Sequence, residues 1–308
     1  TVFVSRSIAE YLAKKGYDVY VLNRDSRKQS EGVTLIQSDR HAIGEKLKGL
    51  YFDVVVDTAY TSDDVSMLHD SLDGYGDYIL ISSSAVYPET LEQPFTEEME
   101  VGPNSIWGKY GTDKIEAETT LMGRNPNAYI VRPPYLYGPY NNLHREAFAF
   151  ECALQNRKFY LPKDGSMKMQ FLHIHDLCLI LDKILETHPA QHIFNVGNKE
   201  SISIKEWVML CYEAAGKTPE FVEVHKEIQQ RLYFSFYDYE YCLDVTKQGQ
   251  LLEDTISMKD GLKQSFDWFV KNPEEVWRKP MIDWIFMCNF QSSHNYITII
   301  FGDNTFIW

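Results

Sequence analysis

The chain has 308 residues, of which 44% are hydrophobic and 24% are charged. These proportions are typical of soluble globular proteins and exclude a disordered, collagen-like or coiled-coil chain, while the length predicts about two domains. The 44 acidic residues outnumber the 30 basic ones, and the resulting net charge of −14 would repel a phosphate backbone, which argues against a nucleic-acid partner.

Six short apolar segments rich in β-branched residues predict strands at residues 17–22, 33–36, 54–57, 78–81, 128–131 and 192–196. They are nearly continuous apolar runs, as expected where helices cover both faces of a parallel sheet. Helical patterns lie between or after them, at residues 5–15, 113–121, 146–155, 176–186 and 204–215. This alternation predicts an α/β fold, namely a Rossmann-like doubly wound parallel sheet with right-handed crossovers.

Both ends of this pattern are unusual. A helix begins almost at residue 1 with no strand before it, so we expect that about ten residues, including the first strand of the sheet, are absent. After Gly197 the alternation fades into a mixed segment rich in tyrosine and phenylalanine, which predicts a smaller second domain. Its aromatic residues either face a sugar or simply pack in the core. They are Tyr233, Phe234, Phe236, Tyr237 and Tyr239.

The last residues, 281–308, are apolar and aromatic but are interrupted too often by polar residues to span a membrane. They form either a dimerising pair of strands or, as we favour, a segment outside the functional fold. Together with the lack of a signal-peptide pattern at the start, this predicts a cytoplasmic protein with no membrane partner. The cysteines are odd in number, far apart and without a Cys-x-x-Cys pair, which fits a reducing compartment and indicates no zinc ribbon. They are Cys152, Cys178, Cys211, Cys242 and Cys288.

Two side chains with acid–base chemistry lie four residues apart at the start of a predicted helix. Tyr110 and Lys114 therefore project from the same helix face. The lysine ammonium would lower the pKa of Tyr110 from its usual value of about 10 towards that of a working acid or base. Because any helical Tyr-x-x-x-Lys matches this pattern, the pair indicates function only in combination with other residues.

Other polar groups follow the ends of two predicted strands. The strand at residues 78–81 ends in three serines at positions 82–84, and the strand at residues 128–131 ends in the segment RPPYLYGP at residues 132–139. Ligands of open α/β sheets bind at the carboxyl ends of the strands, so these hydroxyl groups are placed to contact a substrate.

These motifs resemble the extended short-chain dehydrogenase/reductases, in particular the NAD-dependent epimerase/dehydratase family that acts on nucleotide sugars. The resemblance covers about residues 1–272 and includes the segment MQFLHIHD at residues 169–176. It implies that Ser83, Tyr110 and Lys114 are catalytic. Tyr110 would remove or supply a proton at a sugar hydroxyl, Lys114 would bind the nicotinamide ribose, and Ser83 would hold the reacting oxygen. Pro133 would line the nicotinamide.

The resemblance also implies a domain division. We predict a dinucleotide-binding domain over residues 1–138, completed by about residues 172–197. A smaller α/β substrate-binding portion would comprise residues 139–171 and 198–272, and residues 273–308 would form a tail of unknown role. Family members often pair through helices near Tyr110, so we expect a homodimer.

The start of the chain is similar to the end of the family's glycine loop. Phe3 and Val4 are predicted to bind the cofactor, but Val2 and Ser5 stand where the family has glycines, which predicts looser packing against the pyrophosphate. Further cofactor contacts are expected after each following strand. They are Asn23, Arg24, Arg27, Asp39, Arg40, Thr58 and Ala59.

The cofactor type can be argued from the residues after the strand at residues 17–22, which is the second strand of the sheet if the first is absent. Arg24 and Arg27 could receive a 2′-phosphate where an acidic residue would select a 2′-hydroxyl, so we favour NADP over NAD. The alternative is that both arginines are solvated loop charges.

The reaction and substrate are less determined. Ser84 and Ala85 replace the acidic pair of the family's dehydratases, which leaves an epimerase or a reductase. Met169 replaces an arginine that holds the diphosphate in many members, and the adjacent Lys168 could substitute for it. Residues expected to contact the substrate are Ser84, Tyr135, Asn141 and Asn142, whereas Arg145 and Arg231 are either further donors or surface residues.

Three alternatives stay open. His173 and His175 could suggest a metal pair, but they lack a third ligand at suitable spacing and are interpreted as helix-entry residues, so we expect no metal. The protein could instead be an NADP-dependent reductase of a small carbonyl compound. It could also be a non-catalytic cofactor-binding protein, like atypical relatives that include RNA binders, although the retained Ser83, Tyr110 and Lys114 argue against this.

Overall fold

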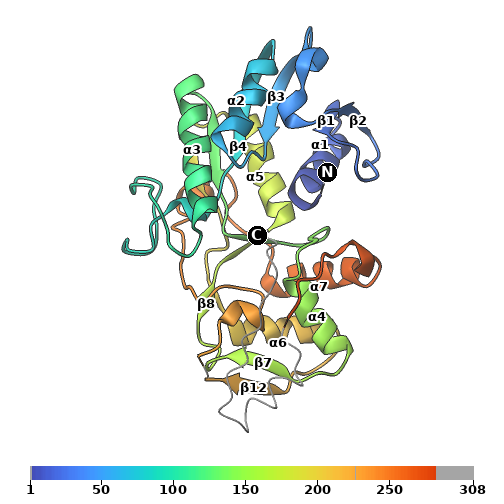
Figure 1. Cartoon of the computed structure of the whole chain (residues 1–308), viewed down its shortest axis with the longest axis vertical. Helices are drawn as coiled ribbons and strands as arrows, with labels where there is room; N and C mark the ends of the chain where they lie inside the picture. Colours follow the sequence, from blue (N-terminus) through green and yellow to red (C-terminus); the bar gives the residue numbers. More distant parts are fainter. Residues whose placement is uncertain (1, 226, 282–308) are drawn as a thin grey trace.

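The computed structural model describes residues 2–225 and 227–281. Its centre is a four-stranded parallel sheet with the strand order β10-β5-β4-β3 (Figure 1). The strands are β3 (Tyr51–Asp57), β4 (Gly74–Ile81), β5 (Tyr129–Arg132) and β10 (Ile193–Asn195). The parallel sheet and its crossover helices confirm the predicted fold class.

A separate parallel pair lies beside this sheet. It consists of β1 (Val19–Asn23) and β2 (Val33–Gln37), in register from Val19 opposite Val33. Among the described residues this pair shares no ladder with β3, although the Tyr20 and Phe52 rings lie 5.7 Å apart. The expected additional strand before residue 1 stays a prediction.

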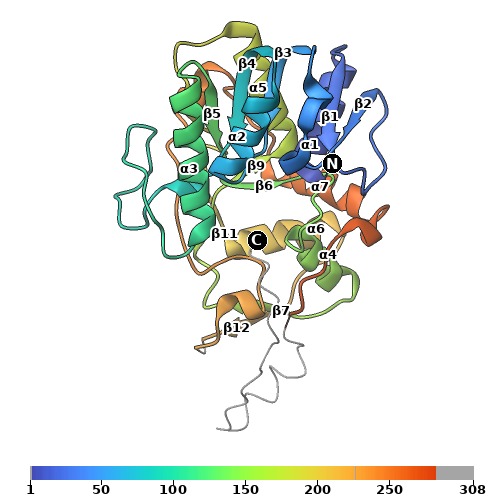
Figure 2. The ribbon, with the colours of Figure 1, turned by 45° about the horizontal axis from the view of Figure 1, so that its top comes forward.

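Helices cover both faces of the central sheet (Figure 2). On one face α2 (Ser62–Ser71) packs beside α3 (Lys109–Arg124), and on the other α1 (Phe3–Lys14) packs beside α5 (Ile174–Thr187). Successive residues of β4 explain the continuous apolar run, because they enter different cores. Tyr78 and Leu80 pack towards α3, whereas Ile79 and Ile81 pack towards α5.

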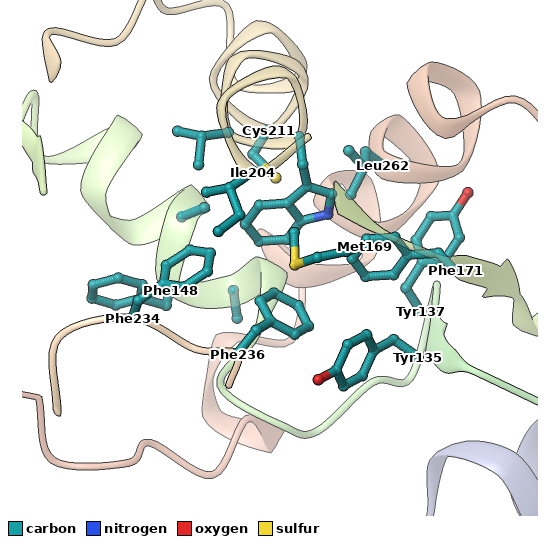
Figure 3. Close-up of a cluster of buried hydrophobic side chains, with 14 of the residues drawn as sticks. Tyr135, Tyr137, Phe148, Met169, Phe171, Ile204, Cys211, Phe234, Phe236 and Leu262 are labelled. Atoms are coloured by element: carbon teal, nitrogen blue, oxygen red, sulfur yellow. The ribbon is translucent and has the colours of Figure 1, made fainter. Parts of the chain in front are cut away.

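A third core lies below the carboxyl ends of the sheet, among α4, α6 and α7 (Figures 1 and 2). The helices are α4 (Glu146–Leu154), α6 (Ile204–Ala214) and α7 (Met258–Phe269). Short strands surround them: β6 (Tyr135–Tyr137), β7 (Phe159–Pro162), β8 (Lys168–Met169), β9 (Phe171–His173), β11 (Ile202–Ser203) and β12 (Phe221–Val224). Phe234 and Phe236 are buried in this core (Figure 3), so for these two residues the packing interpretation is confirmed. The division into domains stays a prediction.

Six 3-10 helices complete the described elements: η1 (Arg40–Ala42), η2 (Gly44–Leu47), η3 (Ser84–Val86), η4 (Gln230–Leu232), η5 (Lys247–Gln250) and η6 (Pro273–Glu275). The five predicted helices and six predicted strands are confirmed to within a few residues, whereas α2, α7 and the short strands around α6 were not predicted. Over residues 2–225 and 227–281, no helix is long and apolar enough to cross a membrane. The predictions for residues 282–308 and Cys288 lie outside the described residues.

Candidate active site

A cavity of ≈ 650 Å³ lies at the carboxyl ends of β4 and β5. The first turn of α1 and the residues after β3 contribute to its wall, as do residues from around α4 and from the segment after α7. This is the edge of the sheet at which open α/β folds bind ligands. All three predicted catalytic residues, Ser83, Tyr110 and Lys114, line this cavity.

Two glycines allow Tyr110 to approach the serine. Gly108, at φ +52°, precedes α3, and Gly111 lies so close to the loop after β4 that an added Cβ would be 2.5 Å from the Ala85 carbonyl oxygen. The first turn of α3 can therefore pack directly on this loop. Tyr110 is thereby placed to hydrogen-bond Ser83.

The pKa of Tyr110 is raised, so the prediction that Lys114 lowers it is wrong for this structure. Burial raises this pKa, and the hydrogen bond with Ser83 and the charge of Arg145 offset the increase only in part. The Lys114 amine instead donates to the main-chain oxygens of Ala59, at 2.6 Å, and Ile81, at 2.9 Å. The phenol of Tyr110 is consequently neutral near pH 7.

Lys114 is almost fully buried, with 3% of its surface exposed. Burial lowers its pKa to about 8, against the opposing effect of Asp57, Glu118 and Asp64. The ring of Tyr60 lies against the amine, with its centroid 4.6 Å from Nζ. Lys114 is therefore mostly charged at neutral pH, but its pKa is close enough to 7 that small changes around it alter the charged fraction.

Five of the residues predicted to bind the cofactor line the cavity beyond the catalytic pair. They are Phe3, Val4, Arg27, Thr58 and Pro133. No described side chain caps the N-terminus of α1, and the Ser5 and Thr58 hydroxyls lie 3.4 Å apart beside it. A helix N-terminus with uncapped N–H groups at a cavity fits an anionic phosphate group. The residues present thus fit a dinucleotide, in spite of the missing glycines.

Five other predicted cofactor contacts lie outside the cavity lining, and their roles stay predictions. Asn23 hydrogen-bonds Gln29. The Arg24 side chain is 75% exposed, 3.8 Å from Asp39, which also accepts from the His41 N–H. The other two have structural partners: Arg40 forms an ion pair with Asp57 at 2.6 Å, and the Ala59 oxygen accepts from Lys114.

The predicted substrate residues are divided in the same way. Ser84, Tyr135 and Asn142 line the cavity, and the Ser84 hydroxyl donates to the Tyr241 oxygen at 3.0 Å. Asn141 is buried outside the lining, where its amide donates to Glu146.

Two arginines extend the lining of the cavity. Arg145 lies 5.1 Å from the Tyr135 ring centroid, and Arg231 lies 4.7 Å from that of Tyr237. Both arginines thus pack against rings of the cavity lining, and their role as donors to a substrate stays a prediction. Lys168 is exposed on β8 and does not contribute to the lining.

Several lining residues were not predicted, namely Tyr60, Trp107, Tyr241 and Trp277. Trp277 belongs to the predicted tail, residues 273–308, for which the sequence indicates no role. Its main-chain N–H donates to the main-chain oxygen of Asn142 at 2.8 Å. Of these four residues, only Tyr60 could have been predicted from the sequence, because it directly follows Thr58 and Ala59 near a strand end. His173 caps α5 by accepting the His175 N–H, which confirms its interpretation as a helix-entry residue. No cluster of metal-ligating residues is found in the part of the chain that is described.

Known proteins match this chain in sequence. Residues 65–197 match the sequence model of the NAD dependent epimerase/dehydratase family. A chloroplast stem-loop binding protein of 41 kDa from Arabidopsis thaliana is 25% identical over 87% of this chain and 76% of its own length. GDP-L-fucose synthase 1 from the same plant is 26% identical over 63% of each chain. This chain thus matches less than two thirds of the synthase.

Solved structures share the fold. UDP-glucuronic acid 4-epimerase from Bacillus cereus, in complex with NAD, aligns with a TM-score of 0.66 at 20% identity, over 88% of this chain and 96% of the epimerase. The dTDP-glucose 4,6-dehydratase from Bacillus anthracis, also with NAD, aligns with a TM-score of 0.68 at 18% identity, over 89% and 96% of the two chains. Residues 65–197 thus match the NAD dependent epimerase/dehydratase family in sequence, and the chain shares its fold with an epimerase and a dehydratase of known structure.

Proposed function

We propose that this protein is an NAD(P)-dependent epimerase or reductase that transfers a hydride on a nucleotide sugar. The observation that carries the proposal is that Ser83, Tyr110 and Lys114 line one cavity with the uncapped start of α1 at one side and two arginines at another. Relatives that act on GDP- and UDP-linked sugars support the substrate class.

Each residue has a role that follows from its surroundings. When bound, the nicotinamide supplies or accepts the hydride. Tyr110, neutral because burial raises its pKa, is in the form that donates a proton to a carbonyl oxygen, which is the reductive direction. Ser83 hydrogen-bonds the same oxygen as its charge changes. Lys114, whose amine is held by the Ala59 and Ile81 oxygens at the cavity, would bind the nicotinamide ribose.

The arginines support a diphosphate rather than a small carbonyl substrate. Arg145 and Arg231 enter the cavity from the α4 and η4 sides, next to the rings of Tyr135 and Tyr237. A planar guanidinium group can donate two parallel hydrogen bonds to the oxygens of one phosphate. An aromatic ring can pack against the apolar face of a sugar or base. A reductase of a small aldehyde or ketone would need neither arginine.

The direct test is turnover on a panel of UDP-, GDP- and dTDP-sugars with each nicotinamide cofactor, followed by mass spectrometry and by absorbance of the reduced cofactor. We expect an isomerised or reduced sugar with the wild type and not with Tyr110→Phe. Tyr17→Phe, which changes a tyrosine outside the cavity lining, is the matched control. Cofactor binding without any product across the panel would refute the proposal.

That negative outcome would favour the second candidate, a non-catalytic cofactor-binding protein. The stem-loop binding relative, which matches 87% of this chain, is the observation that favours it. The net charge of −14 opposes the RNA-binding form of this candidate. Binding of a structured RNA at physiological salt, measured by fluorescence anisotropy, would distinguish the two.

We also propose NADP as the preferred cofactor, because Arg24 is exposed after β1 and Arg27 lines the cavity. A charge-assisted contact to the 2′-phosphate predicts that Arg24→Ala weakens NADP⁺ binding about 10-fold and leaves NAD⁺ binding unchanged. Isothermal titration with both cofactors measures this difference. Equal losses for the two cofactors would contradict the phosphate contact.

A further inference from the structure

Tyr60 lies in the short segment between β3 and α2. Its main-chain N–H donates to Asp64 Oδ2 at 3.0 Å, and the same carboxylate accepts from the Thr61 N–H in the capping box of α2. The side chain lines the cavity, and 41% of the residue is exposed. The hydrogen bonds at the start of α2 therefore fix the main chain of Tyr60, from which its ring extends to the cavity.

The ring contacts both residues assigned to acid–base chemistry. Its centroid is 4.6 Å from Lys114 Nζ and 6.1 Å from the Tyr110 ring centroid, with 51° between the two ring planes. The face of an aromatic ring carries partial negative charge and attracts an ammonium group at this distance.

Carboxylates near Lys114 are bonded to other groups. Asp57 on β3 pairs with Arg40 of η1 and accepts from Tyr78, and Glu118 on α3 pairs with Arg132. Asp64 on α2 accepts two main-chain N–H groups, as described above.

Asp57, Glu118 and Asp64 act on Lys114 through their charge, which favours the ammonium, while Arg40 disfavours it. Within the described ranges no carboxylate forms an ion pair with Lys114, so its contacts are two carbonyl oxygens and the Tyr60 ring.

We propose that Tyr60 is a positioning residue that keeps the Lys114 ammonium charged and held on the cavity floor beside Tyr110. The inference rests on the proposed function for its catalytic consequence, but the contact itself can be tested without a substrate. Because Tyr60 acts through Lys114, its loss should alter the titration of Lys114 and not the fold.

The test compares Tyr60→Leu, which removes the aromatic face but fills the space, with Tyr60→Phe, which keeps the face. NMR of protein carrying ¹³C,¹⁵N-labelled lysine follows Lys114, whose resonance is identified by its absence in Lys114→Arg. Loss of the ring should lower the pKa of Lys114 by about 0.4 to 1.5 in the leucine variant, and the phenylalanine variant should match the wild type. Tyr51→Leu, at the opposite and exposed end of β3, is the matched control.

The catalytic readout follows the same variants. Tyr60→Leu should reduce kcat by about 2- to 30-fold and move the alkaline limb of the pH profile to lower pH, with Tyr60→Phe close to the wild type. If Tyr60→Leu does not fold, Tyr60→Met replaces it.

The two proposals fail in different ways. A folded leucine or methionine variant in which Lys114 titrates as in the wild type overturns the role of Tyr60. A lowered pKa of Lys114 in a protein that turns over no nucleotide sugar supports the contact and refutes the proposed function.

Discussion

Ser82 and Ser83 are neighbours in sequence but belong to two regions that stabilise buried charged groups in different ways. Both serines line the cavity, but Ser82 is buried and donates to Glu118, whereas Ser83 hydrogen-bonds Tyr110. On the Ser82 side the buried ionic groups have hydrogen-bonding partners in the protein. On the Ser83 side the buried ammonium of Lys114 has only uncharged partners among the described residues and lines the space where a ligand would bind.

The Ser82 side forms a continuous network that joins three strands to α3. Glu118 accepts two bonds from Arg132, at 3.0 and 2.6 Å. Arg132 also donates to the Tyr87 hydroxyl at 2.8 Å, and Tyr87 donates to Asn195 at 2.8 Å. Mutual pairing offsets the desolvation of these groups, so the network fixes the ends of β4, β5 and β10.

The cavity side is less fully compensated. Lys114 bonds main-chain oxygens and a ring, and burial shifts its pKa to about 8. Burial also raises the pKa of Tyr110. Groups whose charged form is poorly stabilised by the protein gain most from a ligand that completes their contacts. The ion-paired network therefore fixes the frame, and the adjacent Tyr110 and Lys114, whose hydrogen-bonding partners are uncharged, are available for chemistry.

The largest expected effect is on the cavity side. Tyr110→Phe removes the proton donor and should reduce turnover about 10²- to 10⁴-fold on the nucleotide sugar that the wild type accepts. Its free energy of unfolding should stay within about 0.5 kcal/mol of the wild-type value. Steady-state kinetics and urea unfolding measure the two quantities. Full turnover in the variant would break the assignment of the cavity as the reactive side.

Glu118→Gln should mainly reduce stability rather than turnover, because it leaves Arg132 buried without its carboxylate partner. We expect a loss of about 3–5 kcal/mol in the free energy of unfolding, measured with urea. Glu116→Gln, at an exposed position of the same helix, is the control and should change stability by less than about 0.5 kcal/mol. Equal stability of the two variants would show that the network does not hold the frame.

The sequence predicts the frame better than the pairing within it. The apolar runs of β3, β4 and β5 predict a parallel sheet because burial on both faces leaves a strong local pattern. Helix α2 was missed because Val65 is its only buried residue, although Thr61 and Asp64 form a capping box that marks its start.

For the site, the helical Tyr-x-x-x-Lys pattern, the serines at a strand end and the family resemblance predict Ser83, Tyr110 and Lys114, but not the direction of the pKa shift of Tyr110. That direction depends on burial and on where the Lys114 amine points, and both are set by residues distant in sequence such as Ala59. Trp277 could not be predicted, because its place at the cavity follows from how the segment after α7 packs on Asn142.

His173 offers a third case, a buried titratable group outside both regions. Burial lowers its pKa to about 4, and its Nε2 has no partner among the described residues. Because the folded-state pKa lies below the unfolded value of 6.5, the stability contribution is complete above about pH 6.5 and is lost as the pH falls towards 4.

Replacement by asparagine, which can still cap α5, should remove this dependence. Between pH 7 and pH 4 the wild type should lose about 3 kcal/mol more stability than His173→Asn. His188→Asn, an exposed position at the other end of α5, should follow the wild type. Urea unfolding at a series of pH values measures the difference, and parallel curves for wild type and His173→Asn would show that His173 titrates normally in the folded state.

The smallest effect distinguishes a network from a set of separate bonds. Tyr87→Phe keeps the ring stacked on Phe95 at 5.1 Å but removes the hydroxyl that joins Arg132 to Asn195. Two buried polar groups each lose one partner, so unfolding should become about 1–3 kcal/mol easier. In the double variant with Glu118→Gln the two losses should differ from a simple sum by at least about 0.5 kcal/mol, because both changes act on Arg132. Simple additivity would mean that the Ser82 side is held by independent contacts, and its contrast with the cavity would then be one of burial alone.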